Sequence, residues 1–441
     1  MRMLQISRFF LLPALLLGLG AACSSHHSDP NSVSSPPAIT VQPVNTSTVT
    51  GRLVSLSVTA TGASTPQFPL SYQWAKDGLD ILGARAATFT LYSPNPQDSG
   101  SYTVTVTNAV GSITSSPAIL TVAAAVTFQS AVGVVSDALG NLYVSDANDH
   151  TIWKVDPANQ KTLLAGSPGL PGSSDGQGSN AQFRNPGGLA LDPAGNLVVA
   201  DTGNHTIRRI APDGTVTTLA GSPGVPGSAD GVGAQARFNA PYGIAVDGSG
   251  TVYIADTQNH TIRHMATDGT VTTYAGAAGQ PGLANGANAN ALFNQPNGLA
   301  LAPDGTLVVA DYGNSCIRTI SPAGQVSTLA GSGTSGFADG AGALATFYWP
   351  VGVAVDASGT IWVADTHNHA IRKVLPDHTV STLAGLGGTP GNADGTGTTA
   401  RFSLPCGIAT TPSGNLIVAD TYNHILRVVT PAGVVTTPTA P

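Results

Sequence analysis

The chain has 441 residues and a formal net charge of −7, and only 9% of its residues are Asp, Glu, Lys or Arg. A charge-poor, mildly acidic surface offers few clustered basic side chains to a phosphate backbone, which excludes nucleic acid as an expected partner. The length exceeds what one ordinary core needs, and the cysteines show no spacing typical of a zinc site.

Residues 1–22 predict a signal peptide, with a basic start and an apolar run from Phe9 to Gly20 that is too short to span a bilayer. The segment Gly20-Ala21-Ala22-Cys23 resembles the bacterial lipoprotein signal. The resemblance implies lipidation of Cys23, attachment to the membrane only through this lipid, and a place in the cell envelope. Ser24, rather than an acid, implies the outer membrane. If Cys23 is not lipidated, we expect secretion. Residues 23–37, rich in Ser and Pro, predict a flexible tether.

Residues 38–123 alternate apolar and polar side chains in short runs between turn residues, which predicts an all-β sandwich. With Trp74 in a third-strand position and Tyr102 two residues before Val104, the segment resembles the immunoglobulin-like fold with its tyrosine corner. Val58 and Val104 stand where that family often has a disulfide, so packing against Trp74 must hold the sandwich. We interpret the domain as a spacer, with an adhesive module as the alternative.

Residues 124–441 are organised by a repeat of about 55 residues. In the second copy, the short β runs are Gly188–Asp192, Asn196–Asp201, Thr206–Ile210 and Thr215–Ala220. Four antiparallel strands repeated six times predict a six-bladed β-propeller. The predicted fold is therefore all-β, with the small sandwich followed by the propeller. The copies open at Gly133, Gly188, Gly243, Gly298, Gly352 and Gly407.

The repeats resemble the NHL family through the G-I-A-V-D sequence at Gly243 and the A-D-T-x-N-H sequence around Asp201, Asp256 and Asp365, followed each time by I-R. The first and fourth copies depart from this pattern at Asp149, Trp153, Tyr312, Ser315 and Cys316.

Asp, Asn and His recur in the loop after the second strand of nearly every copy, as at Asp201, Asn204 and His205. Metal binding or acid–base chemistry is one reading. Equivalent sites on separate blades cannot converge on one substrate, so we interpret these residues as turn-forming. The Asp-Gly loops, as at Asp175, supply one carboxylate each, too few for a strong calcium site. We expect no metal or cofactor, with weakly held calcium as the alternative.

Function is expected on the face that carries the long loops, because the opposite face is made of short, uniform turns. Ligands generally bind at concave sites such as a channel mouth. At this mouth we predict a shallow polar and aromatic pocket suited to a glycan or a peptide. Its candidate residues are those that fail to repeat: Tyr242, Asn297, Gln258, His367 and Tyr422.

The innermost strands carry apolar and small residues, without the unlike polar residues by which propeller enzymes hold a metal. We therefore expect a surface-anchored, non-catalytic, monomeric binding or scaffold protein whose partner is a protein or glycan of the cell envelope. A propeller enzyme, as a metal-dependent lyase or lactonase-like hydrolase, is the alternative. A purely structural envelope element is the third reading.

Overall fold

The computed structural model describes residues 35–62 and 69–441, so the predicted signal peptide and Cys23 lie outside the described residues. The described chain is built from strands and short 3-10 helices, which confirms the all-β fold. It divides into two compact units. One contains residues up to Val44, Leu56–Phe89 and Ser101–Ala118, and the other contains Asn45–Ser55, Thr90–Gly100 and Ile119–Pro441. This division runs through the sandwich, and the predicted domain boundaries stay predictions.

The sandwich alternates inward apolar and outward polar residues, and it forms sheets with the strand orders β1-β4, β3-β7 and β2-β10-β8-β5-β6, with β9 on β8. Trp74, Tyr102 and Val104 are almost fully buried, and the indole Nε1 of Trp74 donates to the Ala86 carbonyl at 2.9 Å. The elements are β1 Ala38–Val41, β2 Thr46–Val49, β3 Val54–Ser57, β4 Thr59–Thr61, β5 Ser71–Lys76, β6 Leu79–Asp80, β7 Thr88–Leu91, η1 Pro96–Asp98, β8 Gly100–Thr107, β9 Ser112–Thr114 and β10 Ala118–Ala123.

The repeats fold into one four-stranded sheet, sheet 1, and five five-stranded sheets, sheets 2 to 6 in chain order. Sheet 1 contains β11 Ala131–Ser136, β12 Leu142–Asp146, β13 Thr151–Val155 and β14 Lys161–Ala165. Sheet 2 contains β15 Gly176–Gln177, β16 Leu189–Leu191, β17 Leu197–Asp201, β18 Thr206–Ile210 and β19 Thr215–Gly221. Sheet 3 contains β20 Gly231–Val232, β21 Pro241–Val246, β22 Val252–Asp256, β23 Thr261–Met265 and β24 Thr270–Ala275.

Sheet 4 contains β25 Gly286–Ala287, β26 Pro296–Leu301, β27 Leu307–Asp311, β28 Cys316–Ile320 and β29 Gln325–Ala330. Sheet 5 contains β30 Gly340–Ala341, β31 Val353–Val355, β32 Ile361–Asp365, β33 Ala370–Val374 and β34 Thr379–Gly385. Sheet 6 contains β35 Gly395–Thr396, β36 Pro405–Thr410, β37 Leu416–Asp420, β38 Ile425–Val429 and β39 Val434–Thr436. The second copy matches its predicted runs to within about a residue.

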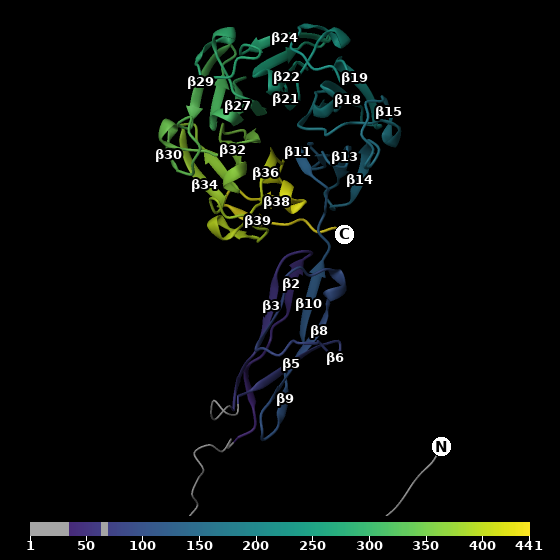
Figure 1. Cartoon of the computed structure of the whole chain (residues 1–441), viewed down its shortest axis with the longest axis vertical. Helices are drawn as coiled ribbons and strands as arrows, with labels where there is room; N and C mark the ends of the chain where they lie inside the picture. Colours follow the sequence, from purple (N-terminus) through teal and green to yellow (C-terminus); the bar gives the residue numbers. More distant parts are fainter. Residues whose placement is uncertain (1–34, 63–68) are drawn as a thin grey trace, which may run out of the picture. The chain divides into compact units, whose positions relative to one another are not determined.

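The sheets stand around a common axis, as Figure 1 shows. We call the innermost strand of each sheet its first strand; β11, β21 and β36, near the centre of Figure 1, are examples. The strands of each sheet are antiparallel, so their connections alternate between two faces of the ring. The loop face carries the long loops between sheets and the short helices η3 Thr202–Asn204, η5 Thr257–Asn259, η7 Tyr312–Asn314, η9 Thr366–Asn368 and η11 Thr421–Asn423. The turn face carries tight turns such as residues 192–195.

The apolar core lies between neighbouring sheets. Phe238, for example, is fully buried among residues of sheets 2 and 3. It follows one of the one-turn helices within the long loops, and its equivalents Phe183, Phe293, Phe347 and Phe402 occupy four of the other seams. These helices are η2 Gly178–Asn180, η4 Gly233–Gln235, η6 Asn288–Asn290, η8 Gly342–Leu344 and η10 Gly397–Thr399.

The ring closes between sheets 6 and 1 with help from the segment that precedes β11. Strand β39 is short and ends before it reaches the start of β38. There, Thr127 pairs with Ile425 of β38 in its place. Phe128 N–H donates to the His424 carbonyl at 2.9 Å. Lys161 lies 4.1 Å from the Phe128 ring centroid and donates to the Thr127 carbonyl at 2.7 Å. Residues from both ends of the repeat region thus complete the last sheet.

Candidate functional site

The repeated Asp and Asn residues of the loop face form a buried network with an arginine in each of sheets 2 to 6. In sheet 2, the Asp201 carboxylate accepts from the Arg184 N–H at 2.8 Å, the Asn204 amide at 2.8 Å and the Arg208 guanidinium at 2.7 Å. Arg208 also donates to the loop carboxylate of Asp175 at 2.7 Å, and both Asp201 and Arg208 are fully buried. The carboxylates are therefore occupied by the protein's own donors, as the turn-forming interpretation requires.

The electrostatics of these carboxylates repeat as well. Burial raises the pKa of Asp256, Asp311 and Asp365 to about 6, and hydrogen bonds from the backbone, an Asn and an Arg oppose the shift. A raised carboxyl pKa marks candidate acids and bases, but buried ion-pair networks produce the same shift. Because these three carboxyl groups occupy equivalent positions in sheets 3, 4 and 5 and have the same raised pKa, the shift follows from the repeated fold.

The repeated histidines link neighbouring sheets at the loop face. His205 sits in the left-handed region with φ 60°, and its Nδ1 accepts the backbone N–H of Ala240 at 3.0 Å. His260 and His369 accept from Gln295 and Leu404 in the same way. An imidazole that accepts at Nδ1 is neutral, and burial lowers the pKa of all three. Each of these histidines therefore joins its own sheet to the next one.

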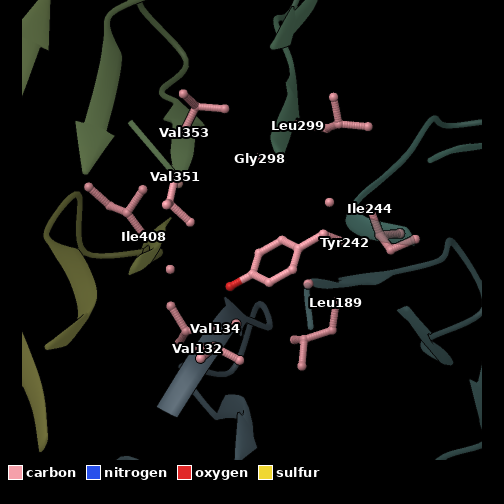
Figure 2. A pocket seen from close by; sticks show the side chains of 15 residues that line it. Val132, Val134, Leu189, Tyr242, Ile244, Gly298, Leu299, Val351, Val353 and Ile408 are labelled. Carbon is pink, nitrogen blue, oxygen red and sulfur yellow. The ribbon is translucent and has the colours of Figure 1, made fainter. Parts of the chain in front are cut away.

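The axis of the ring is narrow and apolar. Gly352 approaches the Cys406 carbonyl of sheet 6 so closely that an added Cβ would lie 2.2 Å from its oxygen. The opening glycine of every other copy makes the same approach to the sheet that follows it. The cavity that remains holds about 60 Å³, and Figure 2 shows Tyr242 reaching into it among apolar side chains of the first strands. Sites for small molecules typically hold about 300–1,000 Å³.

One part of the loop face breaks the repeat and gathers aromatic side chains. Trp349 lies 5.4 Å from Tyr312, 5.1 Å from Tyr348 and 4.5 Å from His367, measured between ring centroids. Tyr348 also lies 5.1 Å from His367. We call these four residues the aromatic cluster. All are half-buried, and they come from η7, η9 and the loop between η8 and β31.

The backbone around the aromatic cluster is fixed by the repeat. Trp349 has φ 51°, an uncommon conformation for a bulky residue. Its equivalents in other copies, Ala240, Gln295 and Leu404, have φ between 47° and 51°. The Tyr348 N–H donates to Asp365 at 2.8 Å, as do the equivalent residues of the other copies to their own carboxylates. The fold thus imposes this backbone, and sheet 5 places a tryptophan on it.

The predicted site residues all lie on or beside the loop face, but the structure does not bring them together. Only His367 belongs to the aromatic cluster. Tyr242 extends into the axial cavity, and burial raises its pKa well above the usual range. Asn297 is half-buried, with an Oδ1 that finds no hydrogen-bond partner within the described chain. Gln258 is exposed, and Tyr422 is 67% exposed.

Sequence reasoning missed Tyr312, Tyr348 and Trp349 as members of one site. Tyr312 replaces the threonine whose hydroxyl elsewhere donates to the next sheet, as Thr257 donates to the Pro296 carbonyl at 2.8 Å. Tyr348 and Trp349 occupy positions held by Asn239 and Ala240 in sheet 3. Aromatic residues thus replace smaller ones just after one copy's second strand and before the next copy's first strand. These neighbouring substitutions were the signal that could have revealed the cluster.

Residues 35–62 and 69–441 contain no group of three or more His, Cys, Asp or Glu side chains placed to hold a metal ion. They also contain no helix with the length and apolarity needed to cross a membrane.

Comparison with known proteins agrees with the immunoglobulin-like and NHL resemblances. Residues 36–108 match the immunoglobulin domain family, and residues 183–210, 238–265, 293–320 and 347–374 match the NHL repeat. The chain is 34% identical over 310 residues to SUPPRESSOR OF QUENCHING 1, chloroplastic, of Arabidopsis thaliana, covering 66% of this chain and 29% of that protein. It is 32% identical over 332 residues to NHL repeat-containing protein 2 of Homo sapiens, covering 67% of this chain and 45% of that protein. It thus spans less than half of either relative.

Among solved structures, an auxiliary nutrient binding protein from Bacteroides thetaiotaomicron superposes with a TM-score of 0.53 and 14% identity, covering 93% of this chain and 99% of that one. A streptogramin B lyase gives a TM-score of 0.46 and 15% identity, covering 71% and 84%. At 14% identity, the similarity to the nutrient binding protein shows the fold alone. The chain carries an immunoglobulin-like domain at residues 36–108 and NHL repeats within a β-propeller.

Proposed function

We propose that this protein binds a neutral glycan through the aromatic cluster on its loop face, without catalysing a reaction. The cluster is the observation that supports the proposal most. Tyrosine and tryptophan rings offer apolar faces to the CH faces of a sugar, and the tyrosine hydroxyls serve as hydrogen-bonding groups. Burial lowers the pKa of His367, so at pH 7 all four rings are uncharged and suit an uncharged ligand.

A rigid backbone supports the cluster as a binding site. The His367 N–H donates to the Tyr348 carbonyl at 3.1 Å, and this bond holds η9 against the loop between η8 and β31. Asp365 in turn holds the Tyr348 N–H. Preorganised side chains lose less conformational entropy when a ligand binds. Gln258 and Tyr422 are exposed on the same face and can contact a longer ligand at its ends.

The lining of the axis supports binding without catalysis. Among the described lining residues, the first strands contribute side chains such as Leu189, Ile244 and Ile408, and Tyr242 is the one with a titratable group. General acid–base catalysis needs positioned titratable groups within hydrogen-bonding reach of a substrate. The repeated carboxylates do not meet this requirement, since protein donors occupy them.

The anchor is a further part of the proposal. We propose that Cys23 carries a lipid that holds the protein at the outer membrane, with the sandwich as a spacer. A Cys23→Ser variant should then appear in the culture medium instead of the membrane fraction. Retention of that variant in the membrane fraction would contradict the anchor.

The binding proposal is tested with an array of neutral glycans and three variants that restore the residue of another copy. Tyr312→Thr, Trp349→Leu and His367→Gln introduce the residues found at Thr257, Leu404 and Gln258, so the fold should tolerate them. We expect each to weaken retention tenfold or more, and Tyr422→Gln to weaken it less. Tyr92→Ser, at an exposed position of the sandwich, is the control that should bind normally. Wild-type retention by all three cluster variants would refute the proposal.

A further inference from the structure

A second unrepeated feature lies on the turn face, away from the aromatic cluster. In sheets 2, 3 and 4, side chains from the three strands that follow the innermost one lie beside the turns of the next sheet. In sheet 3 these are Tyr253 on β22, His264 on β23 and Tyr274 on β24, with ring centroids 5.4 to 6.1 Å apart. In the same register, sheet 1 has Tyr143, Lys154 and Leu164, and sheet 5 has Trp362, Lys373 and Leu383.

The groove beside these rings is large enough for a ligand. It holds about 490 Å³ between sheets 3 and 4, within the range typical of small-molecule sites. Tyr253 and Tyr274 form one wall. The larger apolar side chains that line the groove are Val246, Leu301, Pro303 and Pro322. Two carboxylates, Asp247 and Asp304, also line it. No Lys or Arg is among its described lining residues, so the groove disfavours anions.

Sheets 1 and 5 show which group lies beside the ring at this position, because each has a lysine on the neighbouring strand. The Lys154 ammonium lies 5.8 Å from the Tyr143 ring centroid, and the Lys373 ammonium lies 5.3 Å from that of Trp362. The polar tip of each ring donates to the carboxylate of the neighbouring turn. Trp362 Nε1, for example, lies 3.2 Å from Asp356 Oδ2. In both sheets one ring thus has an ammonium near it and a carboxylate bonded to its polar tip.

Sheet 3 retains the ring and the carboxylate but lacks the lysine. His264 stands in its position, and Tyr274 adds a second tyrosine where sheets 1 and 5 have leucine. Within the described chain, no hydrogen bond engages the Tyr253 hydroxyl, and Asp247 uses only its Oδ1 oxygen, for donors of Ser249 and Thr251. An electron-rich wall and a free carboxylate oxygen remain, and both attract a cation.

We infer that the groove between sheets 3 and 4 binds an alkylammonium group, which takes the place that lysine occupies in sheets 1 and 5. The ammonium lies over the Tyr253 and Tyr274 rings and donates to Asp247, while the alkyl chain contacts Leu301 and Pro303. A free amine and the lysine side chain of a peptide supply the same chemistry. This site is independent of the glycan site on the loop face.

The experiment titrates the full chain by isothermal calorimetry with two ammonium probes and their neutral counterparts. The probes are n-butylammonium and the peptide acetyl-Gly-Lys-Gly-amide, and the counterparts are 1-butanol and acetyl-Gly-Gln-Gly-amide. We expect at least one ammonium probe to bind and its neutral counterpart to bind tenfold or more weakly. Tighter binding of the amine identifies a small molecule as the source, and tighter binding of the peptide identifies a protein.

Two variants test the geometry of the site. His264→Lys supplies the lysine of sheets 1 and 5, so its own ammonium should occupy the groove and reduce probe affinity tenfold or more. Tyr274→Leu removes the second ring and should also weaken binding. Thr319→Lys places the same charge at the equivalent position of sheet 4, and it should stay within twofold of wild type. The inference fails if neither ammonium probe binds, if a neutral counterpart binds equally well, or if folded His264→Lys keeps wild-type affinity.

Discussion

His367 and His369 are two residues apart at η9, yet they belong to different regions of the molecule. The Nδ1 of His369 accepts the Leu404 N–H at 3.0 Å and joins sheet 5 to sheet 6. His367 instead packs 4.5 Å from the Trp349 ring. The position of His369 holds histidine in most copies, whereas the position of His367 changes from copy to copy. The difference shows that residue type does not identify function here, whereas its repetition indicates a structural role.

The same contrast separates the buried network from the aromatic cluster. Asp365 and Arg372 are fully buried and bonded to each other at 2.7 Å. The rings of the cluster remain half-exposed, with surface free to contact a ligand. Substitutions in the network should therefore lower stability, and substitutions in the cluster should lower binding. Four predictions test this separation.

The largest effect is expected for Asp365→Asn. This change removes the carboxylate that neutralises the buried Arg372, and breaking a buried pair typically costs about 3–5 kcal/mol of unfolding free energy. Urea denaturation measures the loss. The control is Asp339→Asn, which removes the second carboxylate partner of Arg372. The Asp339 side chain is 51% exposed, so the loss should be below about 1 kcal/mol. Equal losses would contradict a buried structural network.

A smaller loss of stability is expected for Gly352→Ala. The added Cβ would meet the Cys406 carbonyl at 2.2 Å, and forced overpacking typically costs about 1–3 kcal/mol. Gly248→Ala is the matched control, since nothing lies within 4 Å of its added Cβ. A normal melting temperature for Gly352→Ala would show that the close approach of neighbouring sheets has no structural importance.

The third prediction tests the roles of the two histidines separately. His369→Asn keeps a residue that tolerates positive φ but cannot reach Leu404, so it should cost about 1 kcal/mol of stability and leave glycan binding intact. His367→Gln should do the reverse. The two variants are compared by urea denaturation and glycan retention. If both properties change together in either variant, the regions are not separate.

The smallest effect is a pH dependence of the His369 contribution. Burial, assisted by His367, lowers the pKa of His369 below its unfolded value of about 6.5. Its stabilisation is therefore present above about pH 6.5 and is lost as the pH falls through the folded pKa. The stability difference between wild type and His369→Asn should be about 1 kcal/mol at pH 7.5 and smaller at pH 5.5. A constant difference would mean that Nδ1 is not the acceptor that matters.

Much of the fold could be predicted from the sequence because each sheet is encoded locally. The short apolar run from Leu197 to Ala200 indicates a strand that is buried on both faces, and Gly195 marks the preceding turn, where the structure has a positive φ of 80°. The closure of the ring was not predictable in this way. The pairing of Thr127 with Ile425 joins residues almost 300 positions apart, and no local pattern encodes it.

The candidate site shows the same division. By itself, the sequence determined which face of the propeller varies and that His367 is one of its unrepeated residues, since both follow from comparing copies. Only the tertiary structure decided that His367 meets Trp349, Tyr348 and Tyr312, while Tyr242 extends into the axis. It likewise brought Tyr253 and Tyr274 beside a groove completed by the turns of sheet 4. The physical reason is that these contacts cross between sheets, where distances depend on how whole blades pack.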